Sequence, residues 1–193
     1  MKHLIFCILC FAGVTMFMGS CNSKQTKEVF NDSIQGTFFG VSFGADKKEL
    51  VNKFAERKLV PNPYISTEDF LSFQPIGGRR FSFGGLSWES LNVGMSNGKF
   101  FAISFYNTLK DKAEAIREGK LLIESISAKY KMIKEEPKDS FTYIIYRGKS
   151  IKESGRDVVV HVCRYEGADK KIYYGTFLQY LDRKYEGTVS DEL

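Results

Sequence analysis

One pair of side chains in the sequence has residue types suited to nucleophilic catalysis. His161 and Cys163 lie two residues apart in an apolar segment and alternate onto one face of a predicted strand. Residues two apart on a strand are separated by about 6.6 Å along it, which is long for the hydrogen bond between a base and its nucleophile. We therefore interpret His161 as a semi-buried strand histidine and Cys163 as a small buried thiol.

Anion binding is the chemistry that a glycine-rich basic segment would offer. Gly77-Gly78-Arg79-Arg80 presents backbone amides and two guanidinium groups. A phosphate-binding loop needs a Gly-Lys-Ser/Thr step that opens a helix, whereas a strand is predicted to follow here. The segment is typical of a basic hairpin turn, and Arg79 and Arg80 remain candidate residues of a ligand or partner surface.

Three aromatic residues form a second candidate surface. Trp88, Phe100 and Tyr106 alternate onto the side of their predicted strands opposite the aliphatic residues, and Tyr143 or Tyr146 would extend the set. An exposed aromatic patch marks a partner surface or a platform for sugar rings. A covered patch would instead be a second core layer, which we favour because two predicted helices need faces to cover.

Acidic residues offer little for catalysis. A hydrolase would have to use residues such as Glu89 or Asp157, and no pattern brings two carboxylates onto one defined face. Once the N-terminal segment described below is removed, His161 is the one imidazole and Cys163 the one unmodified thiol. A zinc site and a catalytic triad both need more such groups. We expect a protein that is not an enzyme and that uses no cofactor and no metal.

Composition and charge are those of a globular chain. The 193 residues include 28 Lys+Arg and 23 Asp+Glu, a formal net charge of +5, and 43% hydrophobic residues. This balance excludes a wholly disordered chain and a polytopic membrane protein. The basic residues are scattered among acids and form no stripe, so we expect no nucleic-acid partner.

Two helices are predicted from apolar periodicity and capping residues. Asp46 opens a capping-box pattern that predicts a helix over 47–58. The second helix, capped by Thr108 with Asp111 in its first turn, is predicted to run to about Met132.

The remaining segments alternate in polarity or are bounded by turn residues such as Asn97-Gly98, a strong hairpin signal. The strands predicted in this way span residues 36–43, 69–75, 79–83, 86–95, 99–106, 141–147, 157–165 and 171–181. Runs of strands after each helix indicate an α+β fold, with two helices packed on antiparallel sheet. The two helix-then-meander segments, 36–107 and 108–182, suggest a degenerate repeat within a single domain over 36–182.

The N-terminal segment has the features of a secretion signal. Lys2 and His3 precede a 14-residue apolar run from Leu4 to Phe17. The run is too short to cross a bilayer but suits the hydrophobic region of a signal peptide. We expect residues 1–20 to be removed, residues 21–35 to begin the mature chain at Cys21 and continue as a flexible tether, and residues 183–193 to form a polar tail.

Met18-Gly19-Ser20-Cys21 resembles the lipobox of bacterial lipoproteins, with Met18 where that family prefers Leu. The resemblance implies that the Cys21 thiol is diacylglycerylated, that the chain is cut before it, and that its new amine is acylated. Two or more acyl chains anchor a protein stably to a bilayer. Under the enteric sorting rule Asn22 favours the outer membrane. We expect a lipid-anchored protein of the cell envelope that faces the periplasm or the cell surface.

The start of the mature domain carries a second resemblance. Phe39-Gly40-Val41-Ser42-Phe43-Gly44, followed by Asp46-Lys47-Lys48-Glu49-Leu50-Val51, is similar to a pattern of small outer-membrane assembly lipoproteins and of β-lactamase-inhibitor-like domains. In both families a capped helix precedes an antiparallel meander, and the sheet binds other proteins. The chain departs from the assembly lipoproteins in having two such units. The resemblance implies a fold and a binding role, and it carries over no functional residue.

These observations predict a non-enzymatic envelope lipoprotein whose domain binds an envelope protein or peptide. The candidate surface residues are Trp88, Phe100, Tyr106, Arg79 and Arg80. The alternative is a lipoprotein that binds a glycan or another small ligand with an aromatic sheet face, which the 15% aromatic content favours.

Overall fold

The computed structural model of the protein describes residues 30–31, 33–150 and 155–186. The predicted signal peptide, Cys21 and most of the predicted tether lie outside the described residues, as does the end of the predicted tail. In the described part, two helices pack against a large antiparallel sheet, with two small two-stranded sheets beside it. The predicted α+β class is therefore confirmed.

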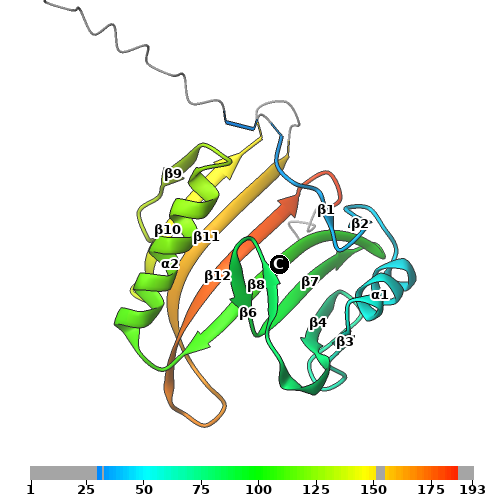
Figure 1. Cartoon of the computed structure of the whole chain (residues 1–193), viewed down its shortest axis with the longest axis horizontal. Coiled ribbons are helices and arrows are strands. Elements are labelled where there is room, and N and C mark those ends of the chain that lie inside the picture. Colours follow the sequence, from blue (N-terminus) through cyan, green and yellow to red (C-terminus); the bar gives the residue numbers. More distant parts are fainter. Residues whose placement is uncertain (1–29, 32, 151–154, 187–193) are drawn as a thin grey trace, which may run out of the picture.

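The large sheet has eight strands in the spatial order β3-β4-β7-β8-β12-β11-β10-β9 (Figure 1). These strands are β3 (Leu59–Pro61), β4 (Phe70–Pro75), β7 (Ser90–Ser96), β8 (Lys99–Leu109), β9 (Met132–Lys134), β10 (Thr142–Lys149), β11 (Arg156–Glu166) and β12 (Ile172–Asp182). The other elements are α1 (Lys47–Glu56), α2 (Lys112–Ser127), the hairpin of β1 (Thr37–Phe38) and β2 (Val41–Ser42), the hairpin of β5 (Phe81–Phe83) and β6 (Leu86–Trp88), and a 3-10 turn (Ile76–Gly78).

Each helix is followed along the chain by its own four-stranded meander. α1 precedes β3, β4, β7 and β8, whereas α2 precedes β9, β10, β11 and β12. The two meanders join where β8 pairs with β12. On each side of this junction, the strands lie in chain order from the edge of the sheet to its centre. The β5–β6 hairpin is an insertion in the first unit. The first unit ends at Leu109, the end of β8, rather than at residue 107.

Both helices begin at an aspartate that caps the first turn. The Asp46 carboxylate accepts a 2.8 Å hydrogen bond from the Glu49 amide, at the predicted capping-box position. The Asp111 carboxylate accepts an equivalent 2.8 Å bond from the Glu114 amide. Each carboxylate satisfies an amide that the first helical turn leaves unpaired.

Both helices and both hairpins pack on one face of the large sheet, which we call the covered face (Figure 1). Alternate residues of the strands point into this core. Phe38, from the β1–β2 hairpin, lies at its centre, with its ring centroid 5.0 Å from Tyr180 and 5.4 Å from Phe43. Phe83 of the β5–β6 hairpin stacks on Phe105 at 4.0 Å. The two hairpins therefore fill the space that the helices leave uncovered.

Gly119 allows α2 to approach the sheet closely. A Cβ atom at this position would collide with the Val162 side chain of β11. The glycine costs about 1 kcal/mol of helix propensity relative to alanine, and the contact with β11 requires a residue without a side chain here.

The opposite side of the sheet, which we call the open face, carries the remaining alternate residues of the same strands. In the described part of the chain, neither a helix nor a further sheet packs on it. An antiparallel sheet with one face packed on the core can leave its other face in contact with solvent, where a ligand or partner can reach it.

Two predicted strands differ from the structure because of local irregularities. The segment predicted as one strand over 86–95 is divided at Glu89 into β6 and β7, which belong to different sheets. A β-bulge shifts the register between β7 and β8 at Gly94, so that Phe100 turns into the core while the Phe101 ring lies over Gly94 on the open face.

The second helix also starts later than predicted. Thr108 lies within β8, where it pairs with Gly175 of β12, and it does not cap α2. The helix ends at Ser127, before the predicted end near Met132, which begins β9.

The folded domain extends beyond the predicted limits of 36–182. Ile34 is 2% exposed and belongs to the core, and the Asn31 amide donates a 2.9 Å bond to the Lys129 carbonyl. At the other end, Arg183 forms a 3.0 Å ion pair with Asp157. The last residues of the predicted tether and the first residue of the predicted tail therefore belong to the folded domain, so both segments are shorter than predicted.

Replacing Phe38 with alanine is expected to lower the free energy of unfolding by about 3–5 kcal/mol, since the change removes a ring from a packed core. Thr37→Ala, at the exposed neighbouring position, should change it by less than about 1 kcal/mol. Urea unfolding followed by circular dichroism measures both values. Equal stability of the two variants would contradict a core role for the β1–β2 hairpin.

Candidate functional site

A row of five residues crosses the middle of the open face, and each residue comes from a different one of five neighbouring strands. The residues paired in succession are Ser90 of β7, Tyr106 of β8, Phe177 of β12, His161 of β11 and Ile145 of β10. We call them the central row. The His161 and Phe177 rings stack with centroids 4.5 Å apart and planes 9° apart. Tyr106 stacks on the other side of Phe177 at 6.0 Å. The centre of the row is thus three stacked rings.

A second pair of rings lies beside the central row. Tyr165 and Tyr173 stack across β11 and β12 with centroids 6.0 Å apart. The Tyr165 hydroxyl shares a 2.7 Å hydrogen bond with the Thr108 hydroxyl. Gly175 lies between this pair of rings and the central row. The Phe177 ring lies over Gly175, so closely that a Cβ atom at residue 175 would collide with it. Half-buried rings therefore occupy the middle of the open face.

Each end of the central row meets a cleft. The cleft at Ser90, which we call the Arg79 cleft, has a volume of about 420 Å³. Its lining includes Gln74, Gly77, Gly78, Arg79, Arg80 and Glu89. The cleft at Ile145, which we call the Lys138 cleft, has a volume of about 610 Å³. Its lining includes Glu135, Pro137, Lys138, Asp139, Thr142 and Arg147.

The two arginines of the Arg79 cleft differ in their partners. The Arg80 guanidinium donates a 2.7 Å bond to Glu89. The second oxygen of Glu89 accepts a 3.0 Å bond from the Thr108 amide. The exposed Arg79 side chain has no hydrogen bond or ion pair with a described residue. Of this pair, Arg79 is the cation available to a ligand.

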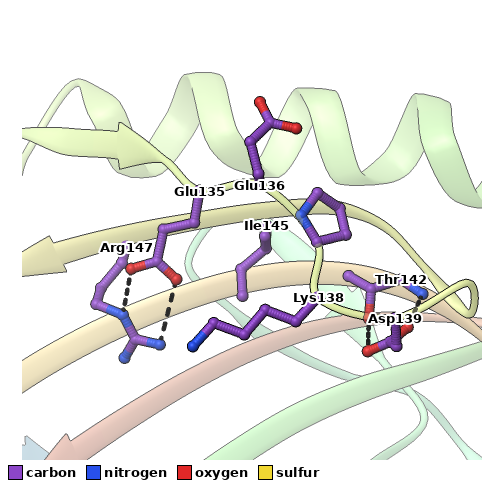
Figure 2. A pocket seen from close by; sticks show the side chains of 8 residues that line it. Glu135, Glu136, Lys138, Asp139, Thr142, Ile145 and Arg147 are labelled. Carbon is purple, nitrogen blue, oxygen red and sulfur yellow. Dashed lines mark hydrogen bonds and ion pairs between the residues drawn. The ribbon is translucent and has the colours of Figure 1, made fainter.

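Figure 2 shows the Lys138 cleft, in which Arg147 is held by acids. Its Nε donates a 2.8 Å bond to Glu135, and its Nη1 donates a 3.3 Å bond to Asp157. The hydrogen bond to Glu135 is the main reason why the pKa of Arg147 is raised. Asp157 is 4% exposed and also accepts a 3.0 Å bond from Arg183. Asp157 and Glu89 thus belong to separate ion pairs and do not form a pair of catalytic carboxylates.

Lys138 extends along the same cleft below Ile145, with its ammonium group toward Arg147 (Figure 2). Asp139, the next residue, is turned toward Thr142, whose amide donates a 2.6 Å bond to it. Amide hydrogen bonds from Thr142 and Phe141 lower the pKa of Asp139. The Lys138 ammonium group forms no ion pair with a residue in the described ranges.

His161 and Cys163 lack the electrostatics of an activated nucleophile and base. Burial lowers the pKa of His161 to about 4, so the imidazole is neutral near pH 7. Burial, and then the carboxylate of Asp139, raise the pKa of the Cys163 thiol. A protonated thiol is a poor nucleophile. The ring that contacts His161 is Phe177, so the histidine contributes to the stacked row.

The structure divides the predicted aromatic surface. Trp88 and Phe100 are both 0% exposed, and the indole of Trp88 donates a 2.8 Å bond to the Phe83 carbonyl. Their assignment to a ligand surface is wrong, because the β5–β6 hairpin folds over the covered face and the bulge at Gly94 turns Phe100 inward. They belong to the core, which is the interpretation favoured from the sequence. Tyr106 lies on the opposite side of the sheet, in the central row.

Tyr143 and Tyr146 do not join Tyr106 either. They line a cleft between α2 and β10, and the Lys112 ammonium group lies 3.9 Å from the centre of the Tyr143 ring. Sequence reasoning did not select Phe177, although alternation along its predicted strand places it on the same side as Tyr173. The missing information was the pairing of β12 with β8, which brings Phe177 beside Tyr106.

Among the described residues, His, Cys, Asp and Glu side chains form no group of three that could hold a metal ion. No helix in the described ranges combines the length and apolar character needed to span a bilayer. Comparison of the chain with protein-family models, with curated proteins and with solved structures finds no match. The geometry of the open face is therefore the basis for a functional proposal.

The free energy of unfolding is expected to fall in acid because of His161. Its pKa is about 4 in the folded chain, against an ordinary value of 6.5. The unfolded chain therefore takes up the proton first, and the stability that the neutral imidazole provides is complete above about pH 6.5 and lost as the pH falls toward 4. The total loss is about 3 kcal/mol.

Urea unfolding of the protein and of His161→Phe between pH 7.5 and 4 measures this loss, because the variant keeps a stacked ring but does not titrate. The difference in free energy of unfolding between the two proteins should change by about 3 kcal/mol over this pH range. Parallel pH profiles would contradict the assigned protonation of His161.

Proposed function

We propose that this protein is a lipid-anchored, non-enzymatic protein of the cell envelope whose open sheet face binds another envelope protein or peptide. The observation that carries the proposal is the open face itself. It presents stacked, half-buried rings between two clefts, on a sheet whose other face is covered by both helices and both hairpins. Partner surfaces are enriched in aromatic residues at their centre and polar groups at their rim.

The central row is built by both halves of the domain. Ser90 and Tyr106 come from the first meander, and Phe177, His161 and Ile145 from the second. Strands are rigid elements, and they hold side chains in position more precisely than loops do. A partner that contacts the whole row would therefore need both meanders in place.

The proposed anchor at Cys21 would keep this surface close to a membrane. The described chain begins at Phe30, nine residues after Cys21. Nine residues span at most about 32 Å when fully extended. The domain would thus stay within reach of other proteins at the same membrane, with the outer membrane favoured by Asn22.

Lipid attachment at Cys21 is testable by metabolic labelling with an alkyne analogue of palmitate in the native host. The protein should be labelled and sediment with membranes, whereas Cys21→Ser should carry no label. Cys163→Ser, which removes the described cysteine of β11, should be labelled like the parent. Unlabelled parent protein, or a labelled Cys21→Ser, would show that Cys21 is not the anchor.

Partner binding at the open face is testable by photo-crosslinking in intact cells. A benzoylphenylalanine at Tyr106 should give a defined adduct of constant mass with an envelope protein, and Phe177→Ala should weaken that adduct several-fold. The matched control is the same probe at Leu121, which is 52% exposed on α2. A lack of any adduct at Tyr106, or the same adduct from both positions, would argue against the proposed surface.

A further inference from the structure

We infer that the central row and its two clefts form one continuous site for an extended peptide segment with a carboxylate toward each end and apolar residues between them. The inference rests on the proposed function and adds the chemistry of the partner. It also adds an orientation, since the segment would cross the strands rather than extend the sheet at an edge.

The length of the segment follows from the strand order. The row runs from Ser90 to Ile145 over five neighbouring strands, each residue paired with the next. Four strand spacings amount to about 19 Å. An extended chain covers this distance with about six residues. The two acidic groups should therefore lie about six residues apart.

The first cation is Arg79. Arg80 beside it is already paired with Glu89, whereas the Arg79 side chain has no partner among the described residues. Gly77 and Gly78 precede it with φ of 77° and 67°, and no atom lies within 4 Å of the position that a Cβ atom would take at either glycine. A peptide can thus approach the backbone here while its carboxylate pairs with Arg79.

The second cation is Lys138, at the other end of the row. The acids beside it are occupied, because Glu135 pairs with Arg147 and Asp139 accepts the Thr142 amide. Glu136 points away from the cleft (Figure 2) and pairs with Lys134. The lining of this cleft holds three carboxylates and two basic side chains. Each of these carboxylates has a partner among the described residues, whereas Lys138 has none there, so an incoming carboxylate would pair with the Lys138 ammonium group.

The middle of the site offers no charge. Phe177, Tyr106 and Ile145 are uncharged, and His161 is neutral near pH 7 because burial lowers its pKa to about 4. A charged residue of the peptide placed over these rings would lose hydration without gaining a partner. Apolar residues gain contact area there, so the middle of the segment should be apolar.

Selection from a displayed library of random twelve-residue peptides tests this assignment, with the full lipoprotein in detergent micelles as the target. Enriched peptides should carry two Asp or Glu residues about six positions apart with apolar residues between them. Selection on Arg79→Gln should remove the preference for one acid, and selection on Lys138→Gln the preference for the other. The matched controls are Arg57→Gln and Lys48→Gln, two exposed positions of the α1 segment, which should leave both preferences unchanged.

For one enriched peptide, Arg79→Gln should weaken binding about tenfold, and an Asp→Asn change at the matching end of the peptide should abolish that difference between the proteins. Unchanged acid preferences in both charge variants would overturn the inference. So would a library without enrichment, or tight binding of chitohexaose, a neutral glycan, that Phe177→Ala abolishes. These failures are distinct from failure of the proposed function, which the crosslinks from Tyr106 decide in intact cells.

Discussion

The pairing of β8 with β12 is the constraint on which the rest of the structure depends. β8 ends the first meander and β12 ends the second, and their register from Ala102–Leu181 to Leu109–Tyr174 joins two four-stranded units into one sheet of eight strands. Because the side-chain period of a strand is two, a slip by one residue at this junction would exchange the two faces of one meander relative to the other. The buried residues Phe105 and Leu178 on one face, and the rings of Tyr106 and Phe177 on the other, hold the register together.

This junction also explains why the two faces have different chemistry. The covered face receives both helices and both hairpins, and aromatic side chains at its centre, with Phe38 and Phe105 among them, are fully buried. The open face has rings that stack on one another, ion pairs such as Arg147–Asp157, and two clefts. Stacking partly shields these rings, which allows the domain to keep an aromatic surface on which no helix or further sheet packs in the described ranges.

The regular parts of the fold follow directly from sequence patterns. The Asp46 cap, the Asn97-Gly98 turn and the three long strands of the second unit lie where the sequence predicts them, because capping, turn formation and alternation are local effects. The bulge at Gly94 and the break at Glu89 were not predicted. The bulge lies within the β7–β8 hairpin, where alternation of polarity does not signal an extra residue, and the break assigns β6 and β7 to different sheets. Trp88 was a candidate surface residue, although burial was the favoured interpretation, because alternation gives two sides to a strand but does not say which side a hairpin covers.

The candidate site shows the same division between local and long-range information. Tyr106, Arg79 and Arg80 were selected from sequence and do line the open face or its cleft. Phe177 and Lys138 reach the site only through the register of β12 and the path of the segment before β10. A single sequence contains no direct signal for either.

Hydroxyl-radical footprinting of the native protein tests the central claim, that the open face is where this domain meets its partner. The side chains of Tyr106 and Phe177 should be oxidised readily in purified protein and become protected in intact envelopes, while Leu121 on α2 reacts equally in both. Equal reactivity of Tyr106 and Phe177 in the two preparations would contradict the account.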